Sequence, residues 1–417
     1  MKNFLKTYKS VIILIAAIII GAIVGIAFGE KAAVLSPLGD IFLNLLFVTI
    51  VPLVFLSITT AISRIKQPKR LGKILVTVFV LFAITTVVAA LIGVFATNVT
   101  KLVDTENGEQ IKASLETSEE VSSEETTEDV TLLERTVQAI TVNDFTGLLS
   151  KNNIIALVVF SIIFGFAIRL AGEKGELVKN FLESAYEIIL KFIHIINYYA
   201  PIGIGCYFAA LIGTFGASIA IGYAKTFIVY LVVAIFYYIV MYSLYAFIAG
   251  GKRGLVAFWK NIIPATATAA ATCSSGASLP INMEASQKIG VSEDIATTSI
   301  PLGASFHKDG SAIGSVFKIM FLVCLFATNP SIWQVIAVAI VANLLITAVP
   351  IGGGTISEMM ILTLMGYPVA ALPILTMIAT IIDVPATVLN VVGDTATSML
   401  AARIVDGKDW MDKKQEK

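Results

Sequence analysis

Charged side chains are scarce in this sequence of 417 residues, of which only 14% are Asp, Glu, Lys or Arg. Soluble domains contain about 25%. Hydrophobic residues make up 57% of the chain, and the mean hydropathy is +0.88. The formal net charge is zero, which excludes the basic surface that nucleic-acid-binding proteins use. The chain is therefore predicted to lie mostly in lipid.

Cysteine is also rare. Cys206, Cys273 and Cys324 lie far apart in apolar stretches, so their spacing matches neither a disulfide framework nor a metal-binding motif. The first apolar run is too long for a signal peptide, and no small-residue cleavage site follows it at the right place. We therefore expect a genuine first membrane span, and we expect no bound cofactor.

Long apolar runs dominate the sequence. A helix crosses the hydrocarbon core of a bilayer with about 20 apolar residues. Runs of this kind lie near residues 11–28, 41–62, 74–97, 154–170, 188–212, 227–249, 313–327 with its upstream half, and 372–403. The predicted fold is an all-α polytopic membrane protein with eight transmembrane helices.

Basic residues alternate with these runs along the chain. They are Lys2, Lys6 and Lys9; Arg64, Lys66, Lys69, Arg70 and Lys73; Arg169, Lys174 and Lys179; Lys252, Arg253 and Lys260; and Lys408, Lys413, Lys414 and Lys417. Positively charged short loops stay in the cytoplasm. Both termini are therefore expected to be cytoplasmic, in a multi-pass protein of the plasma membrane.

One loop has the opposite charge. Residues 101–135 carry eleven carboxylates against three basic residues, and the predicted topology makes this loop extracellular. Such a composition is typical of a solvated and partly disordered segment. The alternative is a loop that attracts cations.

Two apolar segments are interrupted by small, polar or helix-breaking residues. Residues 265–281 contain Ser274, Ser275 and Pro280, and residues 349–365 contain a Gly-rich turn. Irregular backbone survives at membrane depth only inside protein or along a cavity. The pair therefore predicts two re-entrant hairpins, related as inverted repeats, around a binding site at the midplane. The alternative is two amphipathic loops at the membrane surface.

The last run carries Asp383, Asn390 and Asp394, which fall within about 20° of one line on a helix. A carboxylate inside the membrane is a functional candidate by default. Helix-packing polar residues are the alternative. An intramembrane protease is disfavoured, because residues 391–394 lack the first glycine of the protease signature.

A second polar cluster, His307-Lys308-Asp309-Gly310-Ser311, interrupts the preceding run. A glycine there can open the helix, and free carbonyls together with Asp309 would suit a hard cation such as sodium. A structural ion pair is the alternative. His194, alone on a helix, is interpreted as structural.

These motifs together resemble those of the glutamate-transporter-like dicarboxylate/amino acid:cation symporters, especially the neutral amino acid members. The resemblance covers nearly the whole chain and is carried by residues 199–203, 273–280, 301–311, the Gly-rich hairpin and 383–394. It implies a symporter rather than an enzyme. It also implies a homotrimer in which each transport domain moves as an elevator against a static scaffold.

The resemblance also implies a division of the chain. The expected parts are scaffold helices 1–2 (1–73), transport-domain helix 3 (74–100), the acidic extracellular loop (101–150), scaffold helices 4–5 (151–220), and a transport domain with helix 6, hairpin 1, helix 7, hairpin 2, helix 8 and a cytoplasmic tail (221–417). The substrate would lie between the hairpin tips and helices 7 and 8.

The resemblance carries roles to individual residues. Asp383 matches the aspartate that holds the substrate ammonium, and Asn390 matches the asparagine that holds the α-carboxylate. The substrate-binding residues implied are Ser274, Ser275, Ser311, Asp383, Ala386, Thr387 and Asn390. The sodium ligands implied are Asp394 with the carbonyls of Gly303, His307 and Asn390; Asp309 with Thr85 and Thr86; and Ser305 with the backbone of the second hairpin.

Two positions depart from the acidic-substrate members, which clamp a side-chain carboxylate with arginine. Ala386 and Thr272 stand at the two places where that arginine occurs, and Pro385 replaces a glycine and can bend the helix. A buried carboxylate without a partner is strongly penalised. The predicted substrate is therefore a small neutral amino acid such as serine, threonine or alanine, driven by a cation gradient with sodium as the expected ion. The alternatives are a proton-coupled or uncoupled carrier of the same fold, and an acidic amino acid or dicarboxylate symporter.

A second departure from the family, besides the missing arginine, concerns the coupling ion. The family's Asn-Met-Asp-Gly-Thr motif reads His307-Lys308-Asp309-Gly310-Ser311 here. Two like charges at ~4 Å repel by about 4 kcal/mol at an effective dielectric of 20, so Lys308 is predicted to stand in for one sodium ion. Titration of His307 and Lys308 would instead allow proton coupling. A third interpretation pairs Lys308 with Glu358.

Overall fold

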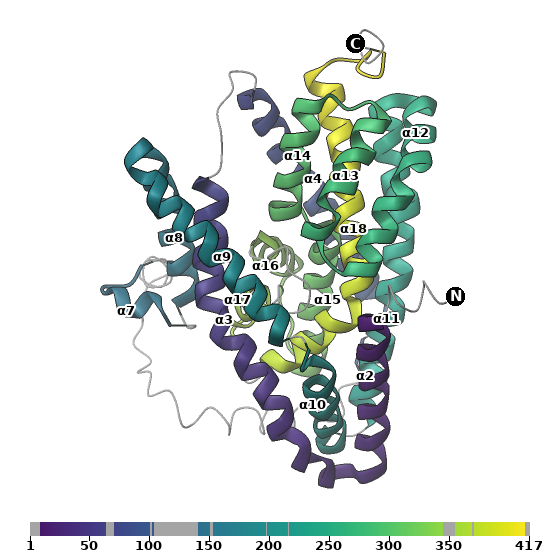
Figure 1. Cartoon of the computed structure of the whole chain (residues 1–417). Coiled ribbons are helices and arrows are strands. Elements are labelled where there is room, and N and C mark those ends of the chain that lie inside the picture. Colours follow the sequence, from purple (N-terminus) through teal and green to yellow (C-terminus); the bar gives the residue numbers. More distant parts are fainter. Residues whose placement is uncertain are drawn as a thin grey trace.

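The computed structural model describes residues 9–63, 71–100, 102–103, 141–150, 153–196, 198–215, 217–344, 355–368 and 371–412. All regular secondary structure within these ranges is helical, as Figure 1 shows. The all-α class predicted from the sequence is confirmed for this part of the chain. The acidic segment that begins at residue 104 and the Gly-rich turn of the second broken segment lie outside the described residues.

One group of helices comes from the first half of the chain. It comprises α2 (Lys9–Phe28), the 3-10 helix η1 (Gly29–Leu35), α3 (Ser36–Ser63), α7 (Phe145–Leu148), α8 (Ile154–Leu170), η3 (Gly172–Gly175), α9 (Glu176–Ile196) and α10 (Ala200–Phe215). Helix α10 packs against α2 and α3, and α3 packs against α8 and α9. Small residues make the first contact possible, since a Cβ atom on Gly21 would overlap the backbone of Gly205.

The second group combines one early helix with the C-terminal half. It comprises α4 (Leu71–Val99), α11 (Ala217–Phe236), the π-helix η4 (Tyr237–Met241), α12 (Tyr242–Thr272), α13 (Ser275–Ile289), α14 (Glu293–Phe306), α15 (Asp309–Leu325), α16 (Ile332–Leu344), α17 (Thr355–Met365) and α18 (Leu372–Val405). Helix α18 packs against α12, α13, α14, α15 and α4 and forms the centre of this group, as Figure 1 shows. Residues 389–402 of α18 are buried throughout.

The first broken segment forms two helices that pack against each other and are joined at Cys273 and Ser274. Cys273 adopts a left-handed conformation with φ 49°, which ends α12. The Ser274 hydroxyl accepts a hydrogen bond from the Ala277 N–H at 3.2 Å and caps α13. Helix α12 itself contains a break at Gly250 and Gly251, where a membrane-length helix ends and the first arm of the hairpin begins.

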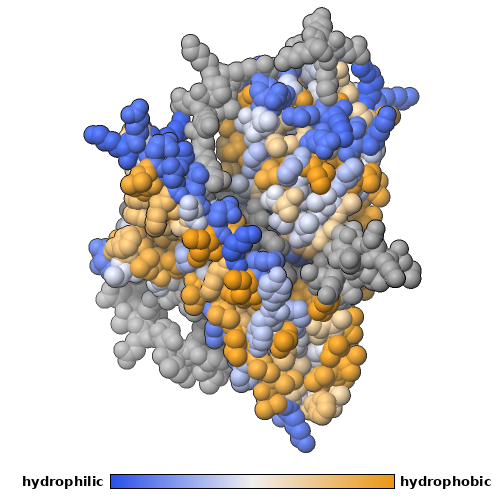
Figure 2. Space-filling model, in the orientation of Figure 1, coloured by the Kyte–Doolittle hydropathy of each residue, from blue (hydrophilic) through white to orange (hydrophobic). Residues whose placement is uncertain are grey.

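The apolar surface agrees with a multi-pass membrane protein. Four helical stretches within the described residues are long and apolar enough to cross a membrane, namely Ala16–Phe42, Gly72–Val99, Ile219–Thr272 and Leu372–Val405. A fifth arises if α9 and α10, bent by 58°, are counted as one span. Figure 2 shows hydrophobic side chains over much of the visible face and hydrophilic ones toward its upper end. The count of eight spans stays a prediction.

Segments that are expected on the cytoplasmic side of the membrane contact one another. Lys73, at the start of α4, donates a hydrogen bond to the Val405 carbonyl at 3.4 Å. Arg253, after the break in α12, forms an ion pair with Asp412 at 2.6 Å. The start of α4, the break in α12 and the segment after α18 therefore lie at the same end of the second helix group. This agrees with the alternation of basic residues, which predicts a common side for them.

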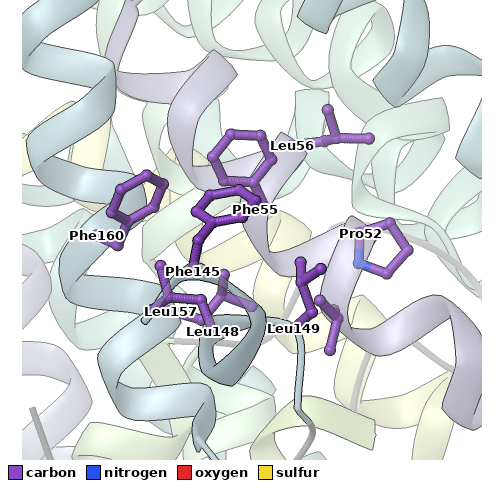
Figure 3. Close-up of a pocket in the computed structure, with 9 residues that line it drawn as sticks. Pro52, Phe55, Leu56, Phe145, Leu148, Leu149, Leu157 and Phe160 are labelled. Carbon is purple, nitrogen blue, oxygen red and sulfur yellow. The ribbon is translucent and has the colours of Figure 1, made fainter. Parts of the chain in front are cut away.

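A cavity of about 310 Å³ lies in the first helix group, between α3, α7 and α8. Figure 3 shows its lining, which includes Phe55, Phe145, Leu148 and Phe160. Every lining residue is apolar. A polar amino acid would find no hydrogen-bond partner there, so this cavity is not a candidate for the substrate site.

Candidate substrate and cation site

The polar cluster of the seventh predicted span lies at a break between two helices. Helix α14 ends at Phe306 and α15 begins at Asp309, and the backbone of His307 is extended between them. The predicted opening is thus present, but it falls before Gly310 rather than at it. Gly310 serves packing instead, because a Cβ atom there would overlap the backbone of Ala386 on α18.

The imidazole of His307 lies at the centre of the cluster and is fully buried. Its Nδ1 is 2.9 Å from Oδ1 of Asp394 on α18, and its Nε2 is 2.8 Å from Oγ1 of Thr85 on α4. The ring of Phe82, also on α4, stacks on it with centroids 4.4 Å apart. One side chain therefore connects the start of α15 with α18 and α4.

Asp309 lies on the other side of this imidazole. Its Oδ1 is 3.1 Å from His307 Nε2, yet this contact is not aligned as a hydrogen bond, and Oδ1 has no hydrogen-bond donor. Its Oδ2 accepts a hydrogen bond from the Tyr237 hydroxyl at 3.2 Å. The carboxylate is therefore held at one oxygen and faces the imidazole with the other.

Tyrosines of α11, η4 and α12 complete the site, and they are not among the residues predicted from the sequence. Tyr230 donates to the Gly310 carbonyl at 2.8 Å, Tyr237 to Asp309, and Tyr242 to the Leu389 carbonyl at 2.6 Å. All three are fully buried. The sequence feature that could have indicated them is the presence of five tyrosines within residues 230–245 of an apolar run. A buried phenol usually needs a hydrogen-bond partner, so such a cluster indicates a polar site inside the bundle.

The predicted substrate residues of α15 and α18 are adjacent. The Asn390 side chain accepts from the Ser311 N–H at 3.2 Å and donates to the Ser311 hydroxyl at 2.9 Å. Within the two preceding turns of α18, the Thr387 hydroxyl donates to Asp383 at 3.4 Å. Asp383 is partly exposed, whereas Asp309 and Asp394 are 0% and 1% exposed.

The first hairpin brings its tip to the same region. Ser274 and Ser275, at the N-terminus of α13, are 9% and 7% exposed. The neighbouring Cys273 thiol lies within electrostatic range of the Asp383 carboxylate. A helix start, whose first N–H groups have no partner within the helix, therefore lies near α18 at Asp383.

The structure also describes three further residues that were predicted to bind cations, namely Gly303, Thr86 and Ser305. Gly303 lies against the Asp394 carboxylate, which a Cβ atom at that position would overlap. Thr86 is buried on α4 beside Thr85. The Ser305 hydroxyl donates to the Pro301 carbonyl of its own helix at 3.3 Å, and the hairpin backbone expected to join it lies outside the described residues.

The interpretation that Glu358 pairs with Lys308 is wrong. Glu358, on α17, contacts Lys318 of α15 at 3.5 Å and accepts a hydrogen bond from Thr376 of α18 at 2.7 Å. Lys318 and Glu358 are 3% and 1% exposed. Lys308 instead lies within electrostatic range of Asp394.

Replacing Glu358 by glutamine is expected to destabilise the protein by about 3–5 kcal/mol, because it leaves the buried Lys318 ammonium without its counter-charge. The double variant Lys318→Met/Glu358→Leu removes both charges and is expected to recover most of this loss. Thermal unfolding of the purified variants in detergent measures both effects. Equal melting temperatures for Glu358→Gln and the double variant would contradict the structural role of the ion pair.

Broken helices whose polar turns meet around buried carboxylates, inside a bundle with an apolar surface, define a membrane carrier. The sodium:dicarboxylate symporter family model matches residues 11–404, and the chain belongs to this family. The resemblance inferred from the sequence motifs is therefore confirmed. The chain is a multi-pass, cation-coupled symporter of a transporter family rather than an enzyme.

Characterised relatives span nearly the full chain. The proton/sodium-glutamate symport protein of Bacillus caldotenax is 28% identical over 400 residues, which cover 93% of this chain and 92% of the relative. The corresponding protein of Bacillus subtilis is 26% identical over 392 residues, covering 93% and 90%. The C4-dicarboxylate transport protein of Bacillus subtilis is 27% identical over 412 residues, covering 96% and 94%.

Proposed function

We propose that this protein is a secondary symporter of a small neutral amino acid of the serine, threonine or alanine type, driven by an inward cation gradient. Asp383 binds the substrate ammonium, because it is the one carboxylate among the three at the site that is partly exposed. Asn390 binds the α-carboxylate together with the N–H groups at the start of α13. Sodium is the expected driving ion.

The neutral substrate is supported by Ala386 and Thr272, because these two positions, where an arginine would clamp a second carboxylate, carry no charge. Ala386 is 7% exposed and packs against the backbone of Gly310. The Thr272 hydroxyl donates to the Thr268 carbonyl at 2.8 Å and accepts from the Ser274 N–H at 3.3 Å. Neither residue can balance a second carboxylate, and an unpaired buried carboxylate is costly.

An acidic amino acid or dicarboxylate is the second candidate substrate. The names of the relatives favour it, since they describe glutamate and C4-dicarboxylate transport. These relatives are no more than 28% identical to this chain, and a single side chain at the site decides between one carboxylate and two. Substrate choice is therefore argued from Ala386 and Thr272 rather than from the names.

The two helix groups suggest how transport proceeds. We assign the group of α2, α3 and α8–α10 to a static scaffold and the group of α4 and α11–α18 to a moving transport domain. In this assignment the transport domain moves as an elevator within each protomer of a homotrimer. The protein would lie in the plasma membrane with both termini in the cytoplasm, where the basic loops belong.

Uptake by the purified protein in liposomes tests the proposal. An inward sodium gradient is expected to drive accumulation of labelled serine, and equal sodium on both sides is expected to abolish it. Unlabelled alanine should compete, and unlabelled aspartate should not. Accumulation of aspartate in place of serine would select the acidic-substrate alternative, while uptake that follows a proton gradient alone would replace sodium as the driving ion.

A further inference from the structure

Three side chains that the family resemblance assigns to two separate sodium sites converge on a single imidazole. Asp394 lies 2.9 Å from His307 Nδ1, and Thr85 lies 2.8 Å from Nε2. Asp309 lies 3.1 Å from the same Nε2. The ring therefore occupies the space between the carboxylates.

The ring is held firmly in this place. Phe82 stacks on one face with an interplanar angle of 14°. A Cβ atom on Gly393 would come within 3.1 Å of His307 Cε1 and 2.8 Å of the Tyr242 hydroxyl. The slot is thus as tight as a glycine allows, and His307 is fully buried in it.

The contacts with the ring differ in kind from the coordination of a cation. An ionised carboxylate only accepts hydrogen bonds, so Nδ1 carries a proton in its bond to Asp394. A ring N–H that points at Asp394 Oδ1 occupies the direction from which a hard cation would bind that oxygen. Lys308, within electrostatic range of Asp394, brings a second basic side chain to the same carboxylate.

We propose that His307 is a built-in substitute for co-transported cations: its imidazole joins Asp309 to Asp394 through their contacts with the ring, so that sodium does not bind at these two carboxylates. This inference rests on the proposed symport function and concerns its coupling. It depends on the position of the ring. Sodium coupling then relies on the one predicted site that these residues do not form, with fewer ions per substrate than three sites would require.

The proposal differs from the interpretation of Lys308 as the substitute for one ion. Lys308 lies within electrostatic range of Asp394, whereas His307 contacts both Asp309 and Asp394 and also the hydroxyl of Thr85. Tyr237 supports the arrangement from the far side, because its hydroxyl donates to Asp309 Oδ2 at 3.2 Å. Removal of the imidazole would free oxygens of two carboxylates and one threonine together.

The test measures sodium binding to the purified protein without substrate. Melting temperatures are compared as sodium chloride replaces choline chloride at constant ionic strength, since a ligand that binds only the folded state raises the melting temperature. Wild type is expected to show at most a small sodium-dependent rise, from the one predicted site that His307 leaves free. The variant His307→Asn/Lys308→Met is expected to gain a rise of several degrees, and His307→Asn alone a part of it.

His194→Asn is the matched control, because His194 is the other histidine of the chain and lies exposed on α9. It should behave as wild type does. If the double variant does not fold, His307→Gln replaces it. The sodium dependence of the wild-type melting temperature tests the proposal in either case. A large sodium-dependent rise in wild type that His307→Asn does not increase would overturn the proposal. Serine uptake by wild type tests the proposed function separately, since the melting experiment contains no amino acid.

Discussion

Asp383→Asn is expected to reduce serine uptake by a hundredfold or more. The change keeps the size of the side chain and its contact with Thr387, but it removes the negative charge that we propose binds the substrate ammonium. Loss of one partner from a buried, hydrogen-bonded charge pair costs about 2–5 kcal/mol, and about 2.8 kcal/mol corresponds to a hundredfold change in affinity. Initial rates of uptake in liposomes, at several serine concentrations, measure the effect.

Asp409→Asn provides the control for this experiment, since Asp409 is exposed near the C-terminus. It removes the same charge from the chain and should leave uptake unchanged. Melting temperatures of both variants separate a lost contact from a lost fold. Serine uptake by Asp383→Asn at the wild-type rate would exclude Asp383 as the ammonium ligand and with it the proposed orientation of the substrate.

Gly310→Ala is expected to lower the melting temperature by roughly 3–10 °C and to abolish uptake. The added methyl group would overlap the carbonyl and Cα of Ala386, which are backbone atoms and cannot rotate away. Helices α15 and α18 would have to separate. That movement would break the Ser311–Asn390 hydrogen bonds and the contact between His307 and Asp394.

Gly72→Ala is the matched control, because Gly72 lies in α4 and a Cβ atom there meets nothing within 4 Å. Alanine favours the helix over glycine by about 1 kcal/mol, so this variant should melt at or slightly above the wild-type temperature. Thermal unfolding in detergent compares the two. If Gly310→Ala melts together with Gly72→Ala, the close approach of α15 and α18 is not required for folding.

Both expectations follow from the convergence of polar groups on α18. The helix meets Ser311 through Asn390, His307 through Asp394, and the hydroxyl of Tyr242 through the Leu389 carbonyl. Residues predicted for substrate and for cation binding thus share one helix. A substrate that shifts Asn390 would also shift Asp394, four residues further along the same helix, and with it the contact between Asp394 and His307.

The sequence alone determined the class of the protein and the location of the break at Cys273 and Ser274. A segment in lipid must satisfy its backbone hydrogen bonds internally, so long apolar runs predict helices without knowledge of their neighbours. The same rule predicts that polar, helix-breaking residues such as Ser274 and Ser275 lie at a protected turn. The family followed from the motifs themselves. The individual roles of the site residues stay predictions, because the structure holds neither substrate nor ion.

Only the tertiary structure decided which side chains meet. Tyr237 reaches Asp309 from a π-helix 72 residues earlier, and His307 reaches Asp394 87 residues later. Glu358 meets Lys318 rather than Lys308. Helical periodicity predicts the direction of a side chain only while the helix continues. At His307 and Lys308 the helix stops, so the direction of each side chain depends on how α4, α15 and α18 pack around the break.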